Sequence, residues 1–194
     1  MEQPVYYYDG PAAVLRAGRQ ADGGHWLPGA GQGSVAVQTL VAAVEGEFGA
    51  ALAMGDTNLA QFGDQVLRDP AADSDPRQAL LLSLAQHNLT RNDDALTQGG
   101  QTRFRSSYSL LPLAAPWTPP PALRFARSFV EPLARHTRRG VLATGAVPCR
   151  SLLSLAPDHV LATGLKVAED GDGWVLRVWE CAGRDAETIV DLSG

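Results

Sequence analysis

Short apolar runs separated by turn-forming residues recur along the whole chain. Apolar and polar positions alternate with a period of two over residues 34–44, 47–54 and 102–110, and this pattern predicts strands that bury one face. The 20 glycines and 13 prolines lie at short intervals between such runs, which is typical of many strands joined by turns. Strands do not alternate regularly with helices in this pattern, which argues against a parallel α/β core.

The clearest local prediction is a hairpin near the C-terminal end of the sequence. Residues 159–167 and 173–180 predict two strands on either side of an acidic, glycine-containing turn at residues 169–173. Asp and Gly tolerate the left-handed backbone that tight hairpin turns require. Along the second strand, the alternation places Trp174, Leu176 and Val178 on one face and Val175, Arg177 and Trp179 on the other.

Two segments have the composition of helices. Residues 78–87 are rich in Leu and Ala, so propensity alone favours a helix there. Residues 121–137 begin with a proline, but Pro132 lies inside the segment and would break a long helix. We therefore expect at most one short helical turn in residues 121–137.

The whole pattern predicts an all-β fold, an antiparallel β-sandwich of two packed sheets with few or no helices. Residues 1–33 are expected to be an irregular N-terminal segment, because residues 10–33 are rich in glycine and poor in large apolar side chains. Residues 34–194 are expected to form the β-sandwich domain.

Composition and charge narrow the classes of function. The chain has 194 residues, of which 45% are hydrophobic and 19% charged, enough to build one ordinary domain, or one domain with a small satellite, without disulfides. The net charge of −5 argues against a nucleic-acid partner, since phosphate backbones are bound by basic surfaces. Because no apolar run approaches the ~20 residues of a membrane helix, and no secretory signal is visible, a cytoplasmic protein without a membrane partner is expected.

The residue types used in catalysis do not occur in the arrangements that catalysis needs. The adjacent acidic pairs Asp93-Asp94 and Glu169-Asp170 would point to opposite faces of a strand, so neither resembles the paired carboxylates of a glycosidase. The four histidines lack metal-ligand spacing, and the widely separated Cys149 and Cys181 are expected to be buried thiols. The residues alone therefore predict no catalytic group and no metal site.

Polar side chains concentrate in one segment that suits sugar hydroxyls. His87, Asn88 and Asn92 follow an apolar run, and each amide offers both a hydrogen-bond donor and an acceptor. The same residues could equally cap a strand and form a turn. Trp117 is a further candidate for contact with carbohydrate, and Trp174 and Trp179 are the other available rings, because sugar binding needs exposed aromatic rings beside amides.

Three stretches resemble the bacterial α-mannosidases of glycoside hydrolase family 38. Residues 88–110 resemble the family's passage with two Asn followed by a Gly-x-x-x-Phe-Arg-x-x-Tyr-x-Leu pattern, although Leu89 and Leu113 stand where the family usually has an aromatic residue and a histidine. Residues 48–64 are similar to the strand that precedes this passage, and residues 165–177 to the family's Leu-Lys-x-Ala-Glu-Asp-Gly hairpin.

The resemblance implies a fold for this chain and places the catalytic residues of the family in a separate domain. The matching part of the family is a β-supersandwich that is galactose-mutarotase-like, whereas the zinc ion and the catalytic carboxylates lie in a separate N-terminal α/β barrel. The resemblance therefore implies no cofactor and no catalytic residue in this chain, with a sandwich truncated relative to the family. Six positions are implied to support the sandwich, namely Arg103, Arg105, Lys166, Glu169, Asp170 and Arg177.

Three functions remain open. The chain is expected to be an accessory domain, inactive alone, that pairs with a catalytic-barrel chain or with further copies of itself. Alternatives are a free-standing module that binds a mannose-type carbohydrate, and the folded remnant of a split glycosidase gene. If a barrel covers part of the domain, a contiguous exposed apolar patch should mark the place.

Overall fold

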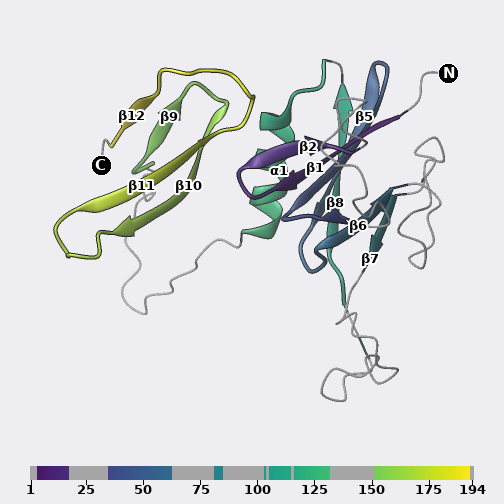
Figure 1. The fold of residues 1–194 in the computed structure, drawn as a ribbon, viewed down its shortest axis with the longest axis horizontal. Coiled ribbons are helices and arrows are strands. Elements are labelled where there is room, and N and C mark those ends of the chain that lie inside the picture. The colour runs from purple at the N-terminus through teal and green to yellow at the C-terminus, as the bar shows by residue number, and fades with distance from the viewer. Residues whose placement is uncertain are drawn as a thin grey trace, which may run out of the picture. The chain divides into compact units, whose positions relative to one another are not determined.

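The computed structural model describes residues 4–17, 35–62, 81–84 (backbone only), 103, 105–114, 116–131 and 151–192. The chain divides into two compact units, Met1–Glu131 and Pro132–Gly194, which are described separately below (Figure 1). The described elements are antiparallel strands and a single helix, so the all-β prediction is confirmed. The expected single sandwich over residues 34–194 needs correction, because the chain divides after Glu131.

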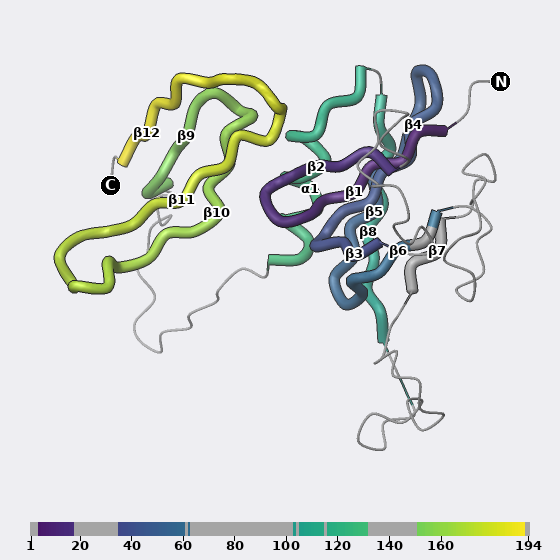
Figure 2. Tube along the Cα trace, in the orientation of Figure 1, coloured from purple at the N-terminus to yellow at the C-terminus, as the bar shows by residue number. Residues whose placement is uncertain are grey.

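A five-stranded antiparallel sheet forms the centre of the first unit (Figures 1 and 2). Its order is β2-β1-β4-β5-β8. The strands are β1 (Val5–Gly10), β2 (Ala13–Arg16), β4 (Leu40–Glu45), β5 (Phe48–Met54) and β8 (Tyr108–Ala114).

A second sheet packs on one face of this first one. It contains β3 (Val35–Ala36), β6 (Leu59–Phe62) and β7 (Leu81–Leu84) in the order β3-β6-β7. The Tyr6 and Phe62 rings stack across the two sheets with their centroids 5.0 Å apart. The buried cluster between the sheets comprises Tyr6, Tyr8, Val35, Val37, Val41, Met54, Ala60 and Phe62, and its burial is the main stabilising contribution to this unit.

The helix α1 (Pro119–Val130) packs on the other face of the five-stranded sheet, against β5, β8 and β4. The expectation of at most one helical turn in this region is wrong. Prolines at the start of α1 occupy the first turn, where a missing N–H costs nothing, and Pro132 lies beyond the C-cap residue Glu131. The buried Ala51 and Ala53 of β5 leave room for the helix to approach closely.

The expectation that residues 1–33 are irregular is wrong where β1 and β2 form, at residues 5–10 and 13–16. Tyr6 and Tyr8 alternate with half-buried neighbours, and both fill the core that β4 and β6 complete. This alternation is a strand signal that the glycine-rich composition of the following residues obscured. Residues 18–34 lie outside the described part.

Three further expectations from the sequence are corrected in the first unit. Residues 78–87 have helical propensity, but residues 81–84 form the strand β7, because pairing with β6 outweighs that propensity. The strand expected at residues 34–44 is divided into β3 and β4. The strand expected over residues 102–110 begins only at Tyr108, while Arg103 and Arg105 are exposed before it.

The second unit contains the hairpin that the sequence predicts. Strands β10 (Val160–Val167) and β11 (Trp174–Glu180) pair antiparallel, with Val167 opposite Trp174. Gly171 and Gly173 adopt positive φ values of 78° and 111°, as the acidic turn requires. A second pair consists of β9 (Ser154–Ala156) and β12 (Ile189–Asp191).

Candidate functional site

The sugar-binding residues expected from the sequence are not brought together in the part of the chain that the structure describes. His87, Asn88 and Asn92 lie outside the described residues. Trp117 is half-buried, and its ring centroid lies 5.4 Å from that of Tyr7. This contact holds Trp117 against β1, so much of its ring is occupied by packing.

The motif residues of the hairpin act on the hairpin itself. Lys166 Nζ donates to Glu169 Oε1 at 3.0 Å, and the Asp170 carboxylate accepts a 3.0 Å hydrogen bond from the Asp172 N–H. Arg177 lies opposite Gly164, and its carbonyl accepts a hydrogen bond from the Thr163 hydroxyl. These contacts stabilise the turn and the strand pairing, and none of them forms a binding pocket.

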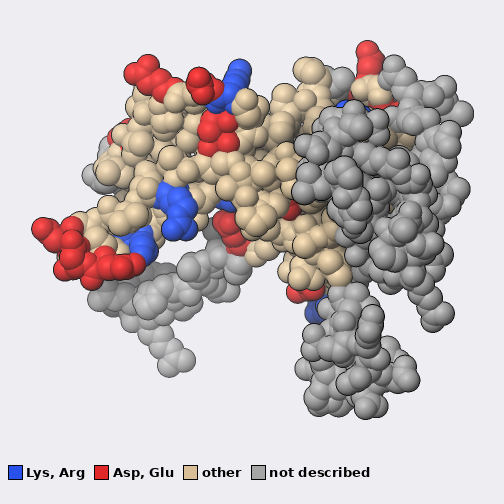
Figure 3. All heavy atoms as spheres, viewed as in Figure 1, with Lys and Arg blue, Asp and Glu red and all other residues tan. Residues whose placement is uncertain are grey.

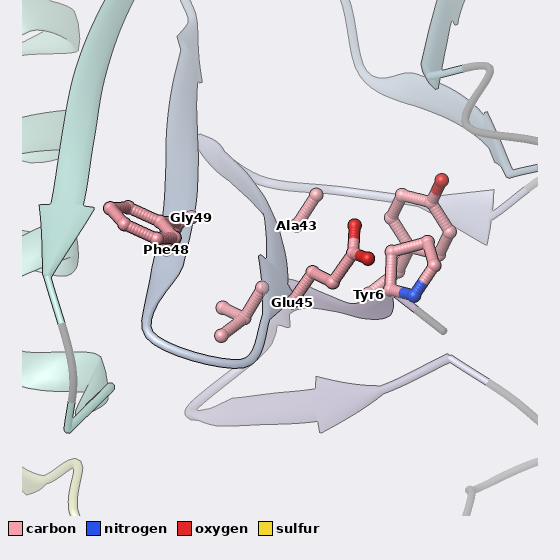
Figure 4. A pocket seen from close by; sticks show the side chains of 7 residues that line it. Tyr6, Ala43, Glu45, Phe48 and Gly49 are labelled. Atoms are coloured by element: carbon pink, nitrogen blue, oxygen red, sulfur yellow. The ribbon is translucent and has the colours of Figure 1, made fainter. Parts of the chain in front are cut away.

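A groove of about 340 Å³ opens at the end of the five-stranded sheet where β4 turns into β5 (Figure 4). Glu45 and Phe48 are register partners across this turn, so both side chains stand on the same face of the sheet. The walls are formed by Pro4, Tyr6, Ala43, Glu45, Phe48 and Gly49.

Glycine keeps the β4–β5 turn compact beside this groove. A Cβ atom at Gly49 would lie 2.7 Å from the Ala43 carbonyl oxygen, a distance that side-chain carbons do not tolerate. Gly46 has a positive φ of 57°, which a glycine adopts without strain. The sequence Glu45-Gly46-Glu47-Phe48-Gly49 therefore specifies both the turn and the floor of the groove.

Among the described residues that line the groove, Glu45 alone carries a charge. Burial raises the pKa of Tyr6 above its usual value of 10.0, and the negative charge of Glu45 raises it further. In Figure 4 the Glu45 carboxylate extends toward Tyr6. Within the described residues, no hydrogen bond or ion pair compensates this carboxylate, so the groove presents an anion between apolar walls.

A second polar cluster lies beside the hairpin of the second unit. The Glu180 carboxylate accepts hydrogen bonds from three successive backbone N–H groups, those of Ala182, Gly183 and Arg184, at 2.7, 2.8 and 3.0 Å. Burial favours a higher pKa for Glu180, but these three donors and the nearby His159 outweigh it and lower the pKa below 4.5. Glu180 thereby fixes the turn that follows β11.

His159 is buried next to this carboxylate. Its Nδ1 lies 3.1 Å from Arg184 Nη2, while its Nε2 has no hydrogen-bond partner and lies 3.9 Å from Glu180 Oε1. The buried Cys181 donates from its Sγ to the His159 carbonyl at 3.2 Å, as expected for a buried thiol; Cys149 is outside the described residues. In the described ranges, no three His, Cys, Asp or Glu side chains gather as a metal site would require.

The sequence interpretation missed both the groove and the Glu180 cluster. The groove depends on Tyr6 meeting Ala43 and Glu45 across a strand pair, which a sequence pattern does not reveal. The only local signal was the short turn with two carboxylates at residues 45–49.

Comparisons with models of known protein families, with curated proteins and with solved structures find no match to this chain. Across the described ranges, none of the helices has the length and apolar character to cross a bilayer.

Proposed function

We propose that this chain is a non-catalytic accessory domain of an α-mannosidase-like glycoside hydrolase of family 38, and that it pairs with a separate catalytic barrel. The resemblance of residues 48–64, 88–110 and 165–177 to that family supports the proposal, as does the antiparallel sandwich of the first unit. The motif contacts at Lys166 and Asp170 also fit a supporting role.

The observation that carries the proposal is exposed apolar surface on both units. In the first unit, the side chains of Phe48 and Leu110 are 78% and 65% exposed. In the second, Trp174 and Ile189 are 71% and 68% exposed. Large apolar side chains that gather on a protein surface mark places that another domain covers.

The second unit in particular would be stabilised by a partner that buries its exposed apolar side chains. Its described residues bury only three apolar side chains, those of Val160, Leu161 and Cys181. Both of its sheets have two strands, and isolated two-stranded pairs are marginally stable in water. A domain that packs against a larger partner removes this instability by burying the hairpin face that carries Trp174.

One feature favours a second function, a free-standing carbohydrate-binding module. Trp174 exposes its ring beside the turn that carries Glu169, Asp170 and Asp172, and Figure 3 shows acidic side chains gathered at the tip of this hairpin. An exposed ring next to carboxylate acceptors suits a sugar with an apolar face and hydroxyl donors.

The decisive experiment combines turnover with assembly. The purified chain should not hydrolyse p-nitrophenyl α-mannoside in the presence of zinc, and it should form a one-to-one complex with a family-38 barrel expressed without its own sandwich, as measured by light scattering. The complex should bury more than about 1,000 Å². Turnover by the chain alone would overturn the proposal.

Mannose titration separates the second function from the first. Saturable quenching of tryptophan fluorescence by mannosides that is lost in Trp174→Ala, together with no complex, would replace the accessory role by the binding module. An unchanged fluorescence and a stable complex would support the accessory role.

A further inference from the structure

The apolar surface of the first unit continues from the groove along one face of β5 and β8. We call this surface the β5–β8 face and define it by Phe48, Tyr108, Leu110 and Pro112, which are all exposed. Tyr108 and Leu110 lie opposite Met54 and Leu52, so the face continues the one that carries the core cluster. Among the described residues, the core cluster draws none from β8, and Leu110 there is 65% exposed.

The outer edge of β8 does not readily accept an added strand, whereas its exposed face is open to a partner. The Gly55 N–H donates to the Ser107 carbonyl at 3.1 Å, so odd-numbered backbone groups of this segment point toward β5. The even-numbered Pro112 therefore faces the outer edge of β8, which no described strand pairs. A proline has no N–H to donate at that edge. A proline at an edge blocks strand addition, so a partner must cover the face.

Charge selects the kind of partner. The groove at one end of the β5–β8 face holds the Glu45 carboxylate between the apolar surfaces of Tyr6, Ala43 and Phe48. Glu47 adds a second negative charge on the same turn, and β4, β5 and β8 contain no Lys or Arg. An occupant with a cation on an apolar stem satisfies both the carboxylate and the walls.

We propose that the groove receives an arginine side chain of a protein partner whose apolar surface covers the β5–β8 face. The apolar stem of the arginine packs against the Phe48 ring, while its planar guanidinium donates two parallel hydrogen bonds to the Glu45 carboxylate. A neutral sugar would leave the negative charge of Glu45 uncompensated. The inference goes beyond the accessory role and does not depend on the family of the partner.

Short peptides that contain arginine test directly whether the groove binds this side chain. The probe is acetyl-leucyl-arginyl-leucinamide, titrated into the intact chain while backbone amide shifts are followed by NMR. We expect saturable shifts at Tyr6, Val44 and Gly49 with a dissociation constant on the order of 1 mM. Replacing arginine by the neutral isostere citrulline should weaken binding about tenfold, because the charge-assisted hydrogen bonds are lost.

Variants on the turn at residues 45–48 assign the contacts, and we expect them to leave the fold intact because these residues are exposed. Glu45→Gln should weaken the arginine peptide about tenfold and leave the citrulline peptide unaffected. Phe48→Ala should weaken both peptides about threefold. The matched control is Glu47→Gln, which removes a charge outside the groove's walls and should change binding less than about twofold.

Tyr6 provides an independent readout of the same site. Because the negative charge of Glu45 helps to raise the pKa of Tyr6, a guanidinium paired with Glu45 should lower that pKa. Saturating arginine peptide and the Glu45→Gln variant should both shift tyrosinate formation of Tyr6 to lower pH.

Four results would overturn the inference. Equal binding of the citrulline peptide would remove the role of charge, and equal binding of a glycine-flanked arginine peptide would remove the role of the apolar face. Shifts at the groove with mannose in place of the peptide would make the site a sugar site. A dimer that Phe48→Ser dissociates would make the occupant a second copy of this chain.

Discussion

The Asp9 carboxylate accepts a 2.6 Å hydrogen bond from the Thr39 hydroxyl and so ties the end of β1 to the turn before β4. The same carboxylate accepts the backbone N–H groups of Gln38, Thr39 and Leu40, and the Asp9 residue is 3% exposed. The Gln38 N–H also donates to the Asp9 carbonyl at 3.2 Å. The Thr39 and Leu40 N–H groups are taken up by the side chain and not by a neighbouring strand, and the turn that they form separates β3 from β4.

Asp9→Ala should destabilise the first unit by about 3 kcal/mol, because it leaves the Thr39 and Leu40 N–H groups and the Thr39 hydroxyl without this acceptor, while the Gln38 N–H keeps the Asp9 carbonyl. Asp9→Asn should cost less, since the amide oxygen can still accept from the same groups. Urea unfolding followed by circular dichroism measures both values. Thr39→Val is the control, and it should lose only the hydroxyl bond, about 1 kcal/mol. Equal stability of Asp9→Ala and the native chain would contradict the assignment.

Gly49→Ala should destabilise the β4–β5 hairpin by about 1–3 kcal/mol, because the new Cβ would lie 2.7 Å from the Ala43 carbonyl oxygen. Gly55→Ala is the matched control, since its Cβ would meet its nearest atom, Phe129 Cε1, at an ordinary 3.5 Å. That control should change the free energy of unfolding by less than about 0.5 kcal/mol. A similar loss in both variants would show that Gly49 acts through flexibility and not through close approach.

The ionisation of Tyr6 should make the first unit less stable at alkaline pH. Its pKa is raised in the folded chain, by burial and then by Glu45. The stabilising contribution is therefore complete below the unfolded value of 10.0 and is lost as the pH rises through the folded value. Tyrosinate absorbance of the native chain minus that of Tyr6→Phe reports this pKa. Glu45→Gln should lower it and reduce the alkaline loss, and an unchanged difference titration would contradict the Coulomb contribution.

Glu180 should make the second unit sensitive to acid. Its pKa is lowered because the backbone donors of Ala182, Gly183 and Arg184 and the adjacent His159 outweigh burial. The stabilisation is therefore present above 4.5 and is lost as the pH falls through the folded value. Glu180→Gln should flatten this acid dependence, measured by hydrogen exchange of the Ala182 to Arg184 amides. Glu187→Gln, which removes an exposed carboxylate, should preserve it.

Local signals gave the correct result where neighbours in sequence supply all that an element needs. The β10–β11 hairpin was predicted because its turn requires the positive φ that Gly171 and Gly173 adopt. The strand β5 followed from the alternation of Phe48 to Met54. Helix α1 was underestimated because Pro132 was placed inside the helix, whereas the helix ends before it.

The sequence by itself determined the class of fold, since alternating apolar positions and frequent turn residues commit the chain to antiparallel strands. Only the tertiary structure decided that β1 belongs to the core, that residues 81–84 are a strand, and that Glu45, Tyr6 and Phe48 surround one groove. Each of these depends on partners far apart in sequence, as Asp9 and Leu40 are at a separation of 31 residues. Propensity acts within a few residues, whereas pairing and burial join residues that only the folded chain brings into contact.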